Sequence, residues 1–260
     1  ETFDTDNIVT GCWSNQGHEN TVKAYGTNAL YTTAAAMAGC VDTYFGSTDS
    51  PNMNQDGNPL HGRHNYVANL HFLYKVANKI QKKASSSNTL TVTKIRNIVK
   101  NLDVTHSKDV TYGTKDIDAI RNVIVRLANN ETLCGKVGVG NLNSFAWAVL
   151  GMAAHLTGDL FTHRTMVPSG ALYEVSSEKK IYESDIYPAY LEKVEFRVRY
   201  GLIEFRDIQV YAGDINGKDY ESERAASRKK YEDNSGFYPT RYAASKNAVG
   251  NLIYLFKGRN

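Results

Sequence analysis

The sequence lacks several features that would assign a function directly. Its 260 residues contain no apolar run close to the roughly 20 residues that a bilayer-spanning helix needs. The three cysteines form no CxxC pair, which argues against a thiolate zinc site or a thioredoxin-like redox pair. There is no GxSxG elbow for a serine nucleophile. The glycine-rich segment GKVGVGN, residues 135–141, lacks the GK[ST] ending of a phosphate loop and predicts a hinge between helices.

An excess of charge of either sign is also missing. The chain has 30 basic and 27 acidic residues, a formal net charge of +3, so its overall field attracts neither nucleic acid nor acidic membranes strongly. Most of its 17 tyrosines lie after His163, among many charges, but the balanced charge predicts no dedicated nucleic-acid face. At 42% hydrophobic residues the composition is that of a globular protein. A partner must therefore be inferred from a specific site.

The first residues, ETFDTDNIVTGCW, contain neither an initiator methionine nor a basic-then-apolar signal. We expect a mature or trimmed chain of a secreted or cell-envelope protein. The cysteines Cys12, Cys40 and Cys134 would allow one bridge and one free thiol in an oxidising compartment. Cys12 to Cys40 is the first expectation, because these two flank the first predicted helix.

The main pattern in the sequence is the helical spacing of its apolar residues. Apolar residues recur at intervals of three and four, which predicts an all-α chain. The predicted helices cover about residues 20–41, 64–83, 89–102, 116–127, 142–165 and 241–256. Residues 194–211 fit either a helix or paired strands, and we favour the helix. We expect one helical, metal-binding domain over residues 1–260, with a tyrosine-rich part from about residue 168.

One stretch, AAHLTGDLFTHRT, places metal-competent side chains on one helix face. His155, Asp159 and His163 follow one another at steps of four. Ala148 and Met152 continue this stripe as apolar residues, so the polar trio is expected to point into the domain. Burying a carboxylate and two imidazoles is costly unless they are paired or bind a cation, and zinc takes both kinds of ligand. The alternative is a His–Asp hydrogen bond with an exposed His163.

Further candidate ligands lie upstream. One histidine stands just before the first predicted helix, and three more cluster near the start of the second with spacings that allow a shared face. Carboxylates precede that cluster at the end of the first helix and in the following loop. These candidates are His18, His61, His64 and His71 among the histidines, and Asp42, Asp49 and Asp56 among the carboxylates.

Together these features resemble the zinc-dependent phospholipase C and P1 nuclease superfamily. The resemblance rests on a small-residue-rich apolar helix ending in HLTGD, on the upstream Asp and His residues and on an all-α chain of this length. It is tight from Phe145 to His163 and loose over about residues 10–165. It implies a mainly helical domain that holds up to three zinc ions in a cleft, where metal-bound hydroxide attacks a phosphate ester.

The resemblance also implies roles for individual residues. His155 and Asp159 match the family's HxxxD pair. His64, or else His61, would match the histidine that joins this pair on the same ion. Asp42, or an aspartate of the following loop, would match their carboxylate partner.

Four further residues receive roles, His18 and His163 by the same comparison, and Asp56 and Arg164 from the chemistry that a bound zinc ion would support. His18 would match the N-terminal histidine that serves a second ion, with Asp159 bridging or orienting. His163 would match the family's next histidine, although it stands four residues past the aspartate instead of about six. Asp56 could be the general base. Arg164 could bind a substrate phosphate, and its alternative is a solvated cation at the helix end.

The family then has an HxxxE helix, whereas no histidine follows His163 here. A full three-zinc cluster of the usual type therefore cannot be assembled. The number of zinc ions, one to three, depends on whether carboxylates substitute, with Glu174, Glu183, Asp185 and Glu195 as candidates. We expect a phospholipase C-like zinc phosphoesterase that acts on a phospholipid or another phosphate ester, a substrate compatible with peripheral membrane contact. The alternatives are a P1-like nuclease and a helical surface or adhesion module that keeps the scaffold without catalysis.

Overall fold

The computed structural model describes residues 15–44, 59–60, 66–102, 114–129, 132–133, 137–159, 164–166, 172–174, 187–188 and 239–258. These residues are 83% helical, as predicted for an all-α chain. Their helices are α1 (Asn15–Lys23), α2 (Ala29–Tyr44), α3 (Tyr66–Ser86), α4 (Val92–Asn101), α5 (Thr114–Ala128), α6 (Leu142–Asp159) and α9 (Pro239–Lys257).

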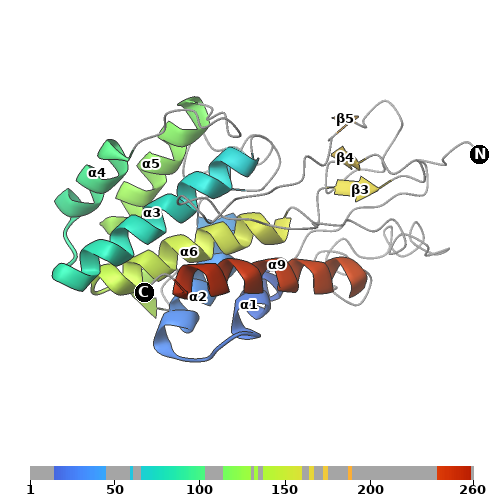
Figure 1. Ribbon diagram of the computed structural model, residues 1–260, viewed down its shortest axis with the longest axis horizontal. Helices are drawn as coiled ribbons and strands as arrows, with labels where there is room; N and C mark the ends of the chain where they lie inside the picture. Colours follow the sequence, from blue (N-terminus) through green and yellow to red (C-terminus); the bar gives the residue numbers. More distant parts are fainter. Residues whose placement is uncertain are drawn as a thin grey trace, which may run out of the picture.

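Helix α6 is the centre of the described fold. Every residue from Phe145 to Asp159 is buried, as expected for a helix that is apolar on all sides from Phe145 to Ala154. Helices α2 and α3 contact it most extensively, and α1 and α9 also pack on it. Figure 1 shows α6 between the outer pair α4 and α5 on one side and α1, α2 and α9 on the other. In the described part of the chain, none of the helices combines the length and the apolar character that crossing a membrane requires.

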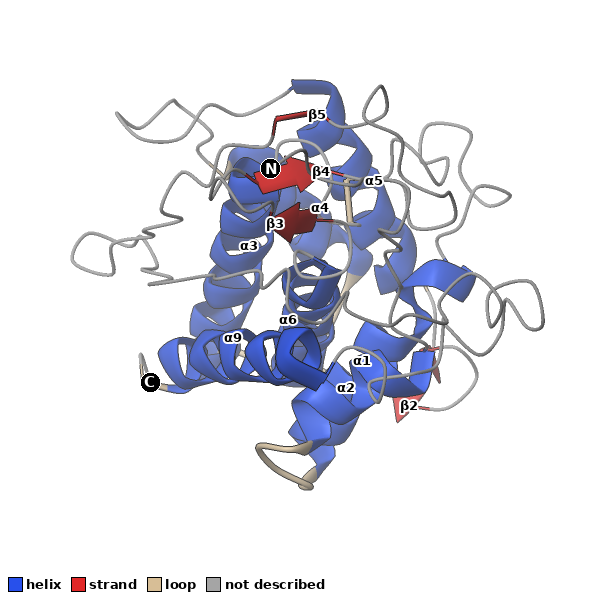
Figure 2. Cartoon of the chain, turned by 90° about the vertical axis from the view of Figure 1, so that its right-hand side faces the viewer, coloured by secondary structure: helices blue, strands red, loops and turns tan. Residues whose placement is uncertain are grey.

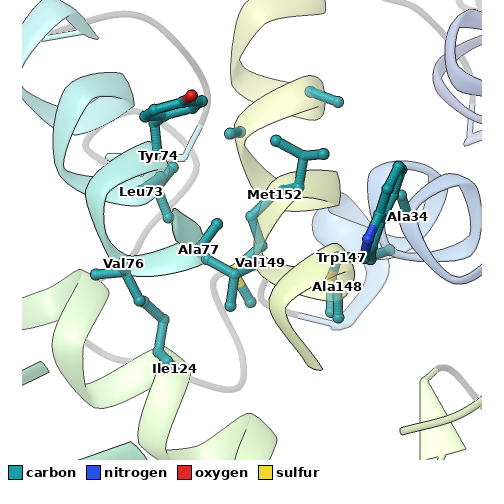
Figure 3. Close-up of a cluster of buried hydrophobic side chains, with 14 of the residues drawn as sticks. Ala34, Leu73, Tyr74, Val76, Ala77, Ile124, Trp147, Ala148, Val149 and Met152 are labelled. Atoms are coloured by element: carbon teal, nitrogen blue, oxygen red, sulfur yellow. The ribbon is translucent and has the colours of Figure 1, made fainter. Parts of the chain in front are cut away.

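Small residues line the contact between α2 and α6. Ala34, Ala35 and Ala38 of α2 are buried, and Figure 3 shows Ala34 beside the Trp147 ring of α6. A Cβ added to Gly151 would collide with the Ala34 carbonyl oxygen. The two backbones therefore approach more closely than larger residues would permit.

Large apolar residues fill the opposite side of α6. Figure 3 shows Leu73 and Tyr74 of α3 beside Val149 and Met152 of α6. Helices α4 and α5 form an outer layer that contacts α3 and buries one apolar stripe from each helix. Thr91 caps α4, since its hydroxyl accepts a hydrogen bond from the Lys94 backbone N–H at 3.2 Å. Helices α3, α4 and α5 lie where their periodicity predicted them.

The helix predicted over residues 20–41 is wrong as a single element. The structure has α1, a turn over residues 24–28, and then α2. The side-chain oxygen of Asn28 accepts the backbone N–H groups of Leu30 and Tyr31 at 3.0 and 3.1 Å, which starts a new helix at this point. His18 consequently lies inside α1 and not ahead of a helix.

The end predicted for the helix over residues 142–165 is also wrong. Helix α6 ends at Asp159, and Arg164–Met166 form strand β3. This strand pairs antiparallel with β4 (Leu172–Glu174), which pairs with β5 (Tyr187–Pro188). Pairing with β4 keeps Arg164 in extended backbone, so it does not continue the helix face of Asp159.

Within the predicted hinge over residues 135–141, Val137–Gly138 form strand β2. This strand pairs antiparallel with β1 (Thr132–Leu133), and α2 contacts both strands. Cys40 of α2 is disulfide-bonded. Cys12 and Cys134 lie outside the described residues, so the pairing of Cys12 with Cys40 stays a prediction.

The predicted terminal helix is confirmed as α9. Its Val249 and Leu252 are buried, and Phe256 packs edge-on against Trp147 of α6 with ring centroids 5.4 Å apart. Figure 2 shows α9 gathered with α1 and α2 along the lower side of the molecule. Residues 194–211, for which we favoured a helix, lie outside the described residues.

Candidate metal centre

Three metal-competent side chains meet at the C-terminal end of α6. Nε2 of His155 lies 2.9 Å from Oδ2 of Asp159, and Nε2 of His18 lies 3.1 Å from Oδ1 of the same carboxylate. One potential ligand atom from each residue lies within 4.8 Å of the other two. The side chains are at most 3% exposed. Helices α1 and α6 therefore enclose a small cluster of nitrogen and oxygen donors.

Helical geometry explains the His155–Asp159 pair. Residues four apart lie one above the other on a helix face, so both side chains leave α6 in the same direction. His18 reaches the pair because Gly158 has no side chain. A Cβ at that position would lie only 3.0 Å from Nδ1 of His18 and 3.2 Å from its Cε1. The missing side chain at Gly158 therefore lets α1 approach α6 closely.

The backbone of α2 fixes the ring of His155. Its Nδ1 lies 2.8 Å from the carbonyl oxygen of Ala38. A carbonyl oxygen can only accept, so Nδ1 must be the donor. In neutral imidazole the proton on Nδ1 leaves a lone pair on Nε2, the atom that faces Asp159. Two electron-rich atoms 2.9 Å apart are favourable only with a cation or a proton between them.

The position of His18 makes simultaneous protonation of both imidazoles unfavourable. The His18 and His155 rings are stacked with centroids 3.9 Å apart and planes inclined by 30°. Two stacked cations at this distance would repel each other in a buried environment. A single metal ion would neutralise the carboxylate while both imidazoles remained neutral.

Asp159 is the charged member of the cluster. Burial by itself raises the pKa of its carboxyl group, whereas positive charge on His155 or His18 when a ring is protonated, and hydrogen bonds from both rings, lower it, and the net pKa lies well below the usual value. The carboxylate is therefore ionised at neutral pH. A buried negative charge between two imidazoles is a setting that attracts a divalent cation.

Among the described residues, only His18, His155 and Asp159 form this cluster, and the other candidates from the sequence are not part of it. The backbone of Asp42 lies on α2, one turn after Ala38, and Arg164 begins β3, but their side chains lie outside the described part. So do Asp56, His61, His64 and His163. Their assigned roles stay predictions. His71 is buried on α3, but it is not among the three clustered ligands.

Sequence reasoning missed the groups that hold the ligands in place. These are the Ala38 carbonyl oxygen and two residues of α9, Tyr242 and Ser245, which bond to the backbone beside His18 and Asp159. A carbonyl oxygen leaves no mark in a sequence. The α9 residues lie 225 and 87 positions from their partners, so no local pattern could reveal them.

Comparisons of the chain with protein-family models, curated proteins and solved structures found no match. The function is therefore inferred from the geometry of this site and from the sequence.

Proposed function

We propose that the protein is a zinc-dependent phosphoesterase in which His18, His155 and Asp159 hold the metal. The observation that supports this most is the orientation of His155. Its Nδ1–H is committed to the Ala38 carbonyl and its Nε2 faces the carboxylate of Asp159. Histidines that bind metal through one ring nitrogen usually donate the other N–H to a carbonyl or carboxylate, which fixes the tautomer.

The donor set suits zinc. Zinc binds imidazole nitrogen and carboxylate oxygen at about 2.0–2.2 Å, so two ligand atoms at a tetrahedral angle on one ion lie about 3.3–3.6 Å apart. The nitrogen–oxygen distances of 2.9 and 3.1 Å are hydrogen-bond distances, and the groups would have to separate by a few tenths of an ångström to hold the ion. Because Asp159 presents a different oxygen to each histidine, one carboxylate could orient both imidazoles or bridge two ions. Asp42, His64, His61 and His163 are the proposed sources of further ligands.

If His18, His155 and Asp159 held zinc, the ion would supply a bound water with a pKa lowered to about 7 and a positive charge for a developing phosphate oxyanion. The protein groups have separate tasks. Asp159 fixes the two imidazoles, Ala38 fixes the tautomer of His155, and burial excludes competing water. Asp56 is the proposed general base, and Arg164 the proposed phosphate contact.

A phospholipid or another phosphate ester is the proposed substrate, by resemblance of the HLTGD helix to the phospholipase C superfamily. A secreted or cell-envelope location is part of the proposal. The disulfide at Cys40 supports it, because such bonds persist mainly in oxidising compartments.

A helical module without catalysis is the second candidate. Two observations favour it: no histidine follows His163, and all three clustered side chains are almost completely buried. In that case the ion would stabilise the fold only, and substrate would have no access to an open coordination position.

Metal content and activity separate the two candidates. The full chain is expressed with zinc, and its metal content is measured beside His155→Ala, Asp159→Ala and His71→Ala. His71 is the control because it is a buried histidine outside the cluster. We expect stoichiometric zinc in the wild type and in His71→Ala, and its loss in the other two variants.

Each protein is then assayed on phosphodiester and phospholipid substrates. Hydrolysis that disappears in His155→Ala supports the enzyme. Zinc without hydrolysis favours the structural module. A wild-type chain that takes up no zinc when it is supplied contradicts both forms of the proposal.

A further inference from the structure

We infer that the C-terminal helix α9 is a positioning element of the metal centre, acting through Tyr242 and Ser245. This inference rests on the proposed function. Neither residue belongs to the ligand cluster. Each bonds instead to the backbone carbonyl immediately before a ligand, so together they fix the two ligand-bearing segments relative to each other.

In both hydrogen bonds the acceptor is the carbonyl oxygen of the residue directly before a metal ligand. The Tyr242 hydroxyl donates to the carbonyl oxygen of Gly17 at 2.9 Å, and Gly17 directly precedes His18. The Ser245 hydroxyl donates to the carbonyl oxygen of Gly158 at 3.5 Å, and Gly158 directly precedes Asp159. The first bond has an ordinary length and the second is at the limit of hydrogen-bond length, so we expect Tyr242 to contribute more.

Both residues lie on one face of α9. Residues three apart are neighbours on a helix surface, and this helix contacts both α1 and α6. Ser245 is completely buried at the junction. A Cβ on Gly158 would lie 3.0 Å from the His18 ring and 3.3 Å from the Ser245 hydroxyl, so the three residues are packed against one another. A shift of α9 would therefore displace both His18 and Asp159.

The remainder of α9 is anchored independently of these two hydroxyl groups. Val249, Leu252 and Phe256 are buried in the core. Near the C-terminal end of the helix, the Lys257 ammonium group donates to the Tyr31 hydroxyl at 2.8 Å. Removing one hydroxyl near the metal centre should therefore leave α9 docked. The expected defect lies in ligand placement, since metal sites need their ligands held within about 0.5 Å.

The test compares Tyr242→Phe, Ser245→Ala and the double variant with Tyr25→Phe. Tyr25 is a matched control because its hydroxyl donates to the Lys246 carbonyl oxygen at 2.7 Å, a bond of the same kind that tethers the same helix. Zinc affinity is measured by competition with a chelator. Unfolding of the zinc-free proteins in denaturant measures the docking of α9 separately.

We expect the double variant to bind zinc about 10–100-fold more weakly than the wild type, the usual effect of losing groups that orient metal ligands. Tyr242→Phe should account for most of the loss, and Tyr25→Phe should stay within about twofold of the wild type. The zinc-free variants should unfold close to the wild-type midpoint. If one variant does not fold, the other single variant is compared with Tyr25→Phe.

Unchanged zinc affinity in the folded variants would overturn this inference while leaving the metal centre intact. Equal losses in Tyr242→Phe and Tyr25→Phe would overturn it as well, because the effect would then reflect general docking of α9. A wild-type chain that binds no zinc would overturn the proposed function itself, and this inference with it.

Discussion

The two helices that flank α6 pack against it in opposite ways. On one side α2 presents alanines, and Gly151 of α6 lets its backbone come close enough for the Ala38 carbonyl to reach the His155 ring at 2.8 Å. On the other side α3 presents larger residues, among them Leu73 and Tyr74, that fill the space with side chains. One interface thus brings backbone polar groups to α6, and the other brings apolar surface.

This difference explains where a metal centre can form. A buried imidazole needs a partner for each ring nitrogen, and a closely packed backbone offers a carbonyl in a fixed position. Large side chains would have kept that carbonyl out of reach. The α3 side should therefore govern stability alone, whereas the α2 side should govern stability and metal binding together.

The largest effect is expected from truncation on the α3 side. Leu73→Ala removes a fully buried side chain beside α6, and it should lower the free energy of unfolding by about 2–5 kcal/mol through lost burial and the cavity left behind. Denaturant unfolding of the zinc-free protein measures this loss. Zinc affinity should remain at the wild-type value. A large drop in affinity would show that the two sides of α6 are not separable.

A pH effect of similar size is expected from the buried histidine of α3. Burial, and secondarily the charge of Lys75, lower the pKa of His71 to about 4. As the pH falls below 6.5, His71 becomes protonated in the unfolded chain but stays neutral in the folded chain until about pH 4. The free energy of unfolding is therefore highest above pH 6.5 and decreases between pH 6.5 and about 4. The loss should approach roughly 3 kcal/mol at pH 4.

His71→Gln removes this titration. Its unfolding free energy should depend less steeply on pH between 6.5 and 4 than that of the wild type, when both are measured in denaturant at several pH values. Parallel curves for the two proteins would show that His71 is protonated equally in the folded and unfolded states.

A substitution on the α2 side is expected to cause the smallest loss of stability and, in addition, a loss of zinc affinity. In Gly151→Ala the new methyl group collides with the Ala34 carbonyl oxygen and should cost about 1–3 kcal/mol. Zinc affinity should fall too, because Ala38 lies one turn further along α2 and its carbonyl would move from His155. Gly140→Ala is the control, since a Cβ there meets nothing within 4 Å. A destabilised Gly151→Ala protein with unchanged zinc affinity would contradict the coupling between α2 and the site.

Much of the helical framework could be predicted because its signals are local. The apolar residues of α3, α4, α5 and α9 recur with the helical period. The apolar sequence of α6 from Phe145 to Ala154 indicates burial on all sides. The errors occurred where a competing signal acted. Asn28 starts a new helix inside the Ala-rich segment, and pairing with β4 holds Arg164 in a strand.

The sequence by itself determined that His155 and Asp159 lie on one face of a buried helix, since a step of four residues is nearly one helical turn. Only the tertiary structure decided that His18 faces the same carboxylate, that Ala38 sets the tautomer of His155 and that α9 holds the segments bearing His18 and Asp159. These contacts join positions far apart in the chain through backbone carbonyls and a missing side chain at Gly158. Helical periodicity specifies neighbours within an element, whereas packing between elements selects the atoms that meet.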